Sequence, residues 1–158
     1  MPWTPGAIFA LSLGAALITG PIAEEFGWRG YLQQKLLNKM APFWAALFLG
    51  CIWWLWHVPL YSASHFASVN PALNFLAYLL TWSLLLIYLV PRAGGSVWPA
   101  VAMHWAANTH PNVMQALLPH VDGRLLPGGS KGALFYLGAA CIFAVLKHRF
   151  FFGRMAGA

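Results

Sequence analysis

Six polar side chains that could do chemistry lie inside otherwise apolar stretches of the sequence. They are Glu24, Glu25 and Arg29 in GPIAEEFGWRG, His57 in CIWWLWHVPL, and His104 and Asn108 in AMHWAANTH. A carboxylate and an imidazole that converge on one water can remove its proton. When that water attacks an amide carbonyl, an imidazole N–H and an asparagine amide can donate to the oxyanion that forms. Together these side-chain types indicate hydrolysis of a peptide bond.

The spacing of the acidic pair and Arg29 predicts separate roles for the two glutamates. Arg29 follows Glu25 by four residues, so the two side chains share a helix face and can pair. Glu24 lies about 100° round the helix and is left for another task. A charge in an apolar membrane helix costs at least about 2.5 to 3.5 kcal/mol. A functional task would explain why the helix contains Glu24 in spite of this cost. The alternative is that all three mark the cytoplasmic end of the helix and are solvated.

The two histidine motifs are expected to reach the depth of Glu24. If the first two helices turn at about residue 40 or 41, Glu24 and His57 both lie about 25 Å from the turn and face each other. His104 and Asn108 are four residues apart and share one face of a later helix. The alternatives are an interfacial histidine in an aromatic belt at His57, and a hydrogen-bonded pair that holds helices together at His104 and Asn108.

Composition excludes a typical soluble domain. Of the 158 residues, 60% are hydrophobic and 8% are charged, compared with about 25% charged residues in ordinary globular proteins. So few charges would leave large apolar patches in water. The net charge of +6 does not indicate nucleic acid, because Lys and Arg stand at the ends of apolar runs, as juxtamembrane anchors do. We therefore expect a membrane protein that binds no nucleic acid.

The apolar runs predict an all-α, polytopic bundle of about five transmembrane helices, in a single domain that covers residues 1–158. Prolines and glycines predict a loop at residues 111–131. The helices are expected at residues 5–37, where one helix continues past the acidic pair, and at residues 43–60, 72–90, 97–109 and 133–151.

The basic residues predict the orientation of this bundle. With five spans, seven Lys and Arg fall on one side of the membrane and two, Arg124 and Lys131, on the other. The side richer in Lys and Arg faces the cytoplasm. The C-terminus and the turn near Met40 are therefore expected in the cytoplasm and the N-terminus outside. Because residues 1–23 contain no Lys or Arg, we interpret their apolar stretch as a retained span and not as a secretory signal.

Three motifs in order resemble a known family, the CPBP intramembrane proteases, also called the CAAX protease and bacteriocin-processing or Abi family. Its pattern is EExxxR, then FxxxH, then HxxxN or HxxxB. Here Glu24, Glu25 and Arg29 are similar to the first motif, and GSVWPAVAMHWAAN resembles the region of the third. The second motif has Trp53 four residues before His57, where the family usually has Phe. The resemblance covers about residues 13–108.

The resemblance implies a helical membrane protease and a role for each motif residue. Its candidate catalytic residues are Glu24 and His57, which would activate water, His104 and Asn108, which would stabilise the oxyanion, and Glu25, which would order the site. Arg29 and Trp53 would support them. Family members are often named as metalloproteases, whereas a glutamate-dependent mechanism without metal has also been proposed for prenyl-protein relatives.

A metal-free site is the favoured interpretation of the residues, because the HExxH helix of typical zinc proteases is missing. The alternative is zinc or another divalent metal held by Glu24, His57 and His104. The expected partners are membrane lipid and a peptide or protein substrate at the membrane. Two other functions stay open: a non-catalytic bacteriocin-immunity or membrane partner protein of the same fold, and a small transporter that uses the acidic pair as a proton relay.

Overall fold

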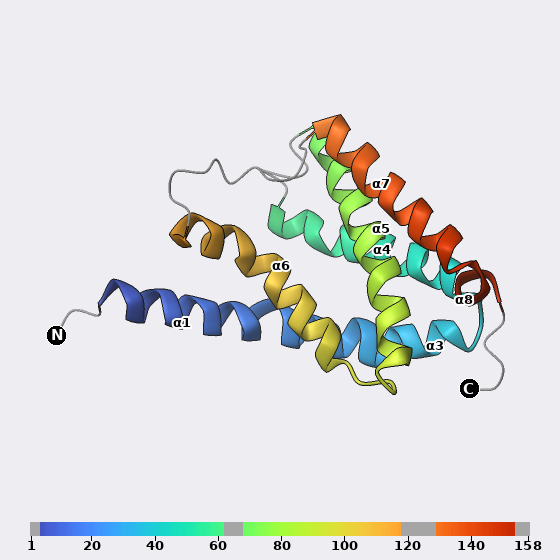
Figure 1. Ribbon diagram of the computed structural model, residues 1–158, viewed down its shortest axis with the longest axis horizontal. Coiled ribbons are helices and arrows are strands. Elements are labelled where there is room, and N and C mark those ends of the chain that lie inside the picture. The colour runs from blue at the N-terminus through green and yellow to red at the C-terminus, as the bar shows by residue number, and fades with distance from the viewer. Residues whose placement is uncertain (1–3, 62–67, 118–128, 154–158) are drawn as a thin grey trace.

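The computed structural model describes residues 4–61, 68–117 and 129–153, which form helices and contain no strand (Figure 1). The predicted all-α class is therefore confirmed for the described part of the chain. In chain order the elements are α1 (Pro5–Leu17), η1 (Ile18–Ile22), α2 (Ala23–Glu25), η2 (Phe26–Leu32), α3 (Gln33–Leu37), α4 (Pro42–Tyr61), α5 (Val69–Arg92), α6 (Trp98–Leu117), α7 (Gly129–Leu146) and α8 (His148–Phe152).

One continuous helical rod runs from α1 to α3, as predicted for residues 5–37. Thr4 caps its start, because its hydroxyl accepts a hydrogen bond from the Ala7 N–H at 3.2 Å, and Pro5 occupies the first turn. The rod is π-helical at η1 and η2, which the sequence analysis did not predict. Pro21 lies in η1, where its missing N–H interrupts the regular α-helical ladder. The short α2, with both glutamates, is thus bounded by π-helical turns.

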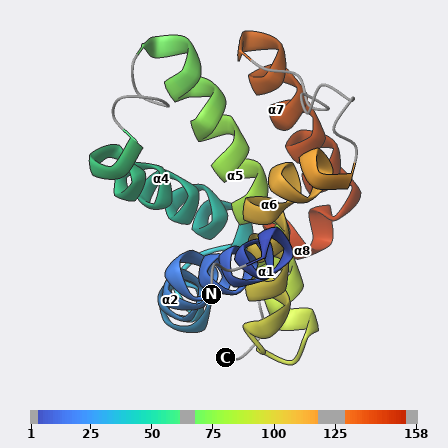
Figure 2. The ribbon, with the colours of Figure 1, turned by 90° about the vertical axis from the view of Figure 1, so that its left-hand side faces the viewer.

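Helix α5 lies between α4 and α7, and Figure 2 shows these three helices in that order. Their buried apolar side chains form the main core, together with residues of α3 and α8. At Gly50 of α4 an added Cβ atom would lie 2.8 Å from Leu80 Cδ2 and 3.1 Å from Leu80 Cα. The two backbones approach so closely because glycine has no side chain there.

Helix α6 lies against α1 and η1 (Figure 1). It continues to Leu117, so the loop predicted at residues 111–131 is wrong at its start. Pro111 removes one backbone donor without ending the helix. The prediction is also wrong at its end, because α7 begins at Gly129, while residues 118–128 lie outside the described part. The last predicted helix, 133–151, is broken by a turn at Lys147 that separates α7 from α8.

Three described helices are long and apolar enough to cross a membrane: Gly6–Leu37, Pro42–Leu60 and Val69–Arg92. The stretch Gly132–Leu146 is apolar but shorter. These helices fit the predicted polytopic membrane bundle, although membrane crossing by α6 and α7 stays a prediction. The arrangement matters for function because the long rod, α4 and α6 carry the three motifs.

Candidate active site

A buried polar stripe runs along one face of the rod from α2 to α3. Glu25, Arg29 and Gln33 follow one another at intervals of four residues, and all three are 0% exposed. Residues at this spacing project from the same helix face. The protein interior thus contains an acid, a guanidinium and an amide aligned along one face of the rod.

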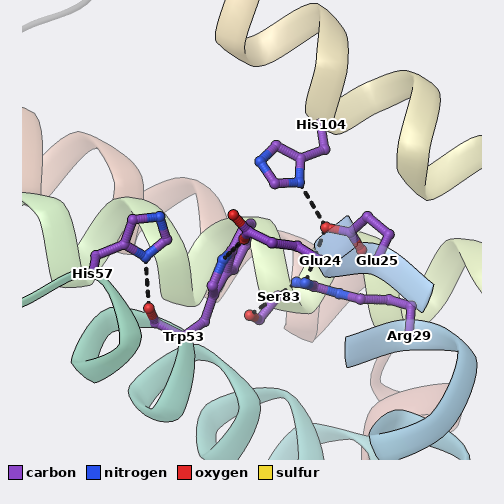
Figure 3. Close-up of polar contacts among 7 residues, drawn as sticks. All are labelled: Glu24, Glu25, Arg29, Trp53, His57, Ser83 and His104. Carbon is purple, nitrogen blue, oxygen red and sulfur yellow. Dashed lines mark hydrogen bonds and ion pairs between the residues drawn. The ribbon is translucent and has the colours of Figure 1, made fainter. Parts of the chain in front are cut away.

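Glu25 is the centre of the charged contacts. Its Oε1 atom accepts a hydrogen bond from Arg29 Nη1 at 3.2 Å, which confirms the predicted pair, and lies 2.8 Å from His104 Nδ1. Arg29 also donates from Nη2 to Ser83 Oγ of α5 at 3.4 Å. One carboxylate oxygen therefore joins α2 to α6, and the guanidinium joins the rod to α5 (Figure 3).

Trp53 of α4 places an aromatic ring in the middle of these groups. The Cζ atom of Arg29 lies 4.3 Å from the centroid of the Trp53 ring, which is a favourable cation–π distance. The ring centroids of His104 and His57 lie 5.2 Å and 5.9 Å from that of Trp53. The indole is 3% exposed, so it is held on several sides by charged or ionisable neighbours.

The partner of Glu24 differs from the one expected. The Trp53 indole N–H donates to Glu24 Oε2 at 2.7 Å, whereas the sequence analysis expected Glu24 to face His57. The predicted depth of Glu24 along α4 was correct to within one helical turn, because its partner Trp53 lies one turn from His57 in α4. Residue spacing places Glu24 beside this turn of α4 but does not determine whether Trp53 or His57 is its partner.

His57 contacts both its own helix and α5. Its Nδ1 atom lies 2.7 Å from the Trp53 carbonyl oxygen, and the ring makes an edge contact with Phe75 of α5 at 5.2 Å between centroids. A carbonyl oxygen can only accept, so Nδ1 carries the proton in this contact. In the neutral ring the lone pair is then on Nε2, where it can serve as a base.

Asn108 is the most exposed of the motif residues and lies near Gly20 of η1. A Cβ atom at Gly20 would lie 3.5 Å from Asn108 Nδ2 and 3.8 Å from Glu24 Oε1. The Asn108 amide and the second oxygen of Glu24 therefore border the same glycine. Absence of a side chain at Gly20 keeps open the space between these two polar groups.

The rod (α2 and η2), α4 and α6 thus bring five motif residues close together. Each contacts another of the five or Trp53 (Figure 3): they are Glu24, Glu25, Arg29, His57 and His104. Asn108 borders the same region through Gly20. No three His, Cys, Asp or Glu side chains of the described residues are grouped so that they could hold a metal ion. The alternative ligand set of Glu24, His57 and His104 does not form a coordination sphere with these side-chain positions.

Ser83 and Gly20 also border the site, although their sequence context does not predict this. Ser83 is 1% exposed and stands in the apolar run TWSLLLI, where a polar side chain needs a partner. That signal marks a buried contact but does not identify Arg29. Gly20 gave no signal, because glycines are common in membrane helices.

The fold and the site define a multi-pass, all-α membrane protein with a buried cluster of acids, an arginine and two imidazoles. Residues 6–110 match a family described as type II CAAX prenyl endopeptidase Rce1-like, and this match covers more than half of the chain. The chain therefore belongs to that family, which confirms the resemblance to CPBP proteases.

One curated relative is the CAAX prenyl protease 2 of Methanococcus maripaludis, to which the chain is 28% identical over 142 residues. The aligned part is 85% of this chain and 50% of that protein, so the chain spans about half the length of this curated relative. No solved structure matches the chain significantly.

Proposed function

We propose that the chain is an intramembrane endopeptidase that hydrolyses a peptide bond of a membrane-associated or lipidated peptide. The observation that carries this proposal is the convergence of Glu24, His57 and His104 on Trp53 from three separate helices. Family membership and the name of the archaeal relative support the same reaction class. The four side chains proposed to act in catalysis, Glu24, His57, His104 and Asn108, are all retained, which disfavours a non-catalytic immunity or partner protein of the same fold.

In this proposal Glu24 and His57 activate the water. Trp53 occupies Oε2 of Glu24, so Oε1 is the oxygen available to accept a water proton. The Nε2 lone pair of His57 is the second acceptor, because Nδ1 donates to the Trp53 carbonyl. The water loses its proton as its oxygen bonds to the amide carbon. The proton then passes to the leaving nitrogen as the C–N bond breaks.

His104 and Asn108 stabilise the tetrahedral oxyanion. For His104 to donate from Nε2 while Nδ1 donates to Glu25, both ring nitrogens must carry protons. Glu25 then pairs through one oxygen with both the imidazolium and the Arg29 guanidinium. A donor of this kind is worth about 2.7 to 4 kcal/mol where it has been removed from an oxyanion hole.

The role proposed for Glu25 and Arg29 is to hold His104 rather than to touch the substrate. Glu25 Oε2 and Arg29 Nε are buried and have no hydrogen-bond partner among the described residues, so this ion pair is incompletely satisfied. A buried ion pair whose remaining polar atoms are not hydrogen-bonded contributes little to stability compared with apolar packing. The Glu25–Arg29 pair is therefore expected to act by fixing the orientation of the His104 ring and by stabilising its positive charge.

We favour the metal-free scheme, because the potential ligands of the described residues are not grouped for metal binding. Metal content of the purified protein and its turnover with and without a chelator test this choice. Stoichiometric zinc, with activity that is lost on chelation and restored by zinc, would replace the proposed scheme with a metal-dependent one.

The proposed topology has the C-terminus in the cytoplasm and the N-terminus outside, and it rests on the asymmetry of Lys and Arg. Reporter fusions at each terminus test it. A C-terminal fluorescent protein that folds only in the cytoplasm should fluoresce, and a C-terminal phosphatase active only outside should be silent. The opposite pattern would reverse the assignment.

The activity itself is tested with protein reconstituted in liposomes. The substrate is a fluorogenic peptide with a prenylated cysteine three residues from its C-terminus, and a matched peptide without the lipid is the comparison. Cleavage should be lost in Glu24→Gln and His57→Ala, with turnover lower by about 10² to 10⁴-fold. Cleavage that both variants retain in full would contradict the proposed mechanism. A preference for the unlipidated peptide would contradict the substrate class.

A further inference from the structure

We propose that Trp53 is a positioning residue for the water-activating pair: its indole N–H holds Glu24 and its carbonyl oxygen holds His57. This inference rests on the proposed function, since it assigns the pair a catalytic task. The two contacts come from one residue, and both have donor–acceptor distances of 2.7 Å.

The indole contact sets which oxygen of Glu24 is free. Trp53 Nε1 donates to Oε2, and Oε1 lies on the side of Gly20 and Asn108. The two oxygens of a carboxylate are chemically equivalent, so this charge-assisted hydrogen bond fixes the direction in which the second oxygen points. Trp53 thus directs the unoccupied oxygen toward the amide that is proposed to bind the oxyanion.

The indole itself is unable to turn away from Glu24. The Arg29 Cζ atom lies 4.3 Å from the centroid of the Trp53 ring, and the centroid of the His104 ring lies 5.2 Å from it. Arg29 is in turn fixed by Glu25 and by Ser83 of α5. The buried ion pair therefore reaches Glu24 through the aromatic ring, and Trp53 connects the two glutamates that follow each other in α2.

The carbonyl contact sets which ring nitrogen of His57 carries the proton. His57 is four residues after Trp53 in α4, so its ring reaches back to the carbonyl of the preceding turn. Because this oxygen only accepts, the Nε2 lone pair faces away from the carbonyl. One residue therefore selects the acceptor atom in both members of the pair.

The test compares two tryptophans of α4. Trp53→Phe keeps an aromatic ring and the backbone carbonyl but removes the donor to Glu24. Trp54→Phe is the matched control, because Trp54 donates its indole N–H to the Ala72 carbonyl of α5 at 3.1 Å and so loses a comparable bond outside the site. With the prenylated peptide, Trp53→Phe should lower kcat about 10- to 100-fold with KM unchanged, whereas Trp54→Phe should keep both constants.

A second replacement isolates the hydrogen bond from the shape of the ring. Trp53→3-benzothienyl-alanine replaces the N–H by sulfur in a ring system of nearly the same size. It should reproduce the loss of kcat seen in Trp53→Phe. Full activity of this variant, when Glu24→Gln is inactive, would overturn the role of Trp53 and leave the proposed function intact. Equal activity of wild type and Glu24→Gln would instead overturn the proposed function.

A spectroscopic measurement tests the contact without any substrate. In protein with ¹⁵N-labelled tryptophan, the indole N–H signal of Trp53 is assigned by its disappearance in Trp53→Phe. Glu24→Ala should shift this signal because its charged acceptor is removed, and should leave the Trp54 signal in place. A Trp53 signal that does not respond to Glu24→Ala would overturn the inference, whatever the activity of the protein.

Discussion

The Nδ1 atom of His104 lies 2.8 Å from Oε1 of Glu25, although 79 positions separate the two residues in the chain. This contact joins α6 to α2 and uses the same oxygen that accepts from Arg29. Glu24, the neighbour of Glu25, contacts α4 through Trp53. Two adjacent glutamates therefore reach the two other motif helices, one each.

Asn108→Ala should reduce turnover while leaving the fold intact. Asn108 is exposed, and substitutions of exposed residues usually change stability by less than about 0.5 kcal/mol. Loss of an oxyanion donor should reduce kcat by about 10² to 10³-fold. Steady-state kinetics with the prenylated peptide and thermal unfolding in detergent measure the two effects. Normal kcat in a folded Asn108→Ala protein would remove Asn108 from the oxyanion site.

Arg29→Met should destabilise the protein more than the loss of any exposed cation. The substitution leaves the buried Glu25 carboxylate without its ion-pair partner, and breaking a buried pair costs about 3 to 5 kcal/mol. Arg92→Met is the control, since Arg92 is exposed and stacks on the Tyr88 ring at 4.1 Å. Chemical unfolding followed by tryptophan fluorescence gives both free energies.

The double variant Glu25→Gln/Arg29→Met separates the charge from the packing. It removes both charges together, so it should be more stable than Arg29→Met alone. Arg29→Lys should recover little, because a lysine cannot reproduce the two donors to Glu25 and Ser83 together with stacking on Trp53. A double variant that is less stable than Arg29→Met would contradict the proposed burial cost of Glu25.

Gly50→Ala should destabilise the contact between α4 and α5. The new methyl would lie 2.8 Å from Leu80 Cδ2, 3.1 Å from Leu80 Cα and 3.3 Å from Ser83 Oγ, so one of the helices has to shift. Overpacking of this kind costs about 1 to 3 kcal/mol. Gly14→Ala is the matched control, because nothing lies within 4 Å of its Cβ position. Equal unfolding free energies for the two variants would show that α4 and α5 can move apart at Gly50 without a loss of stability.

Gly20→Ala should impair turnover with little effect on stability. Its methyl would make ordinary contacts, 3.5 Å from Asn108 Nδ2 and 3.8 Å from Glu24 Oε1, and would fill the space between these atoms. A substrate carbonyl or water displaced by about 1 Å can lose about 10²-fold in rate. Gly27→Ala in the same rod meets nothing within 4 Å and is the control. If the two variants have equal activity, the reacting groups do not meet beside Gly20.

Much of the fold could be predicted from hydropathy, because apolar runs of membrane length have few other structures available. The continuous rod past Glu24, the turn near residue 40 and the helices α4 and α5 follow from such runs and from prolines. The extension of α6 past Pro111 could not, because a proline is tolerated in a helix when its neighbours compensate. The break at Lys147 depends on packing of α8 against α4.

The site was predictable where one helix determines the geometry. A spacing of four residues correctly predicted that Glu25 pairs with Arg29. Contacts between helices depend on rotation about each axis, which residue spacing does not determine. For that reason the contact of Glu25 with His104, and the choice of Trp53 as the partner of Glu24, required the three-dimensional structure.

The π-helical turns on both sides of α2 determine where the rod can lose a residue without harm to the site. Each such turn holds a surplus residue relative to a regular α-helix, so deletion of one residue from η1 is expected to convert it to α-helix and to keep α1 near its present orientation relative to the acidic pair. Deletion of one residue from the regular helix α1 would instead turn everything before it by about 100° about the axis. A single-codon loss in α1 is therefore expected to leave an apolar, membrane-length rod that faces α6 with the wrong side.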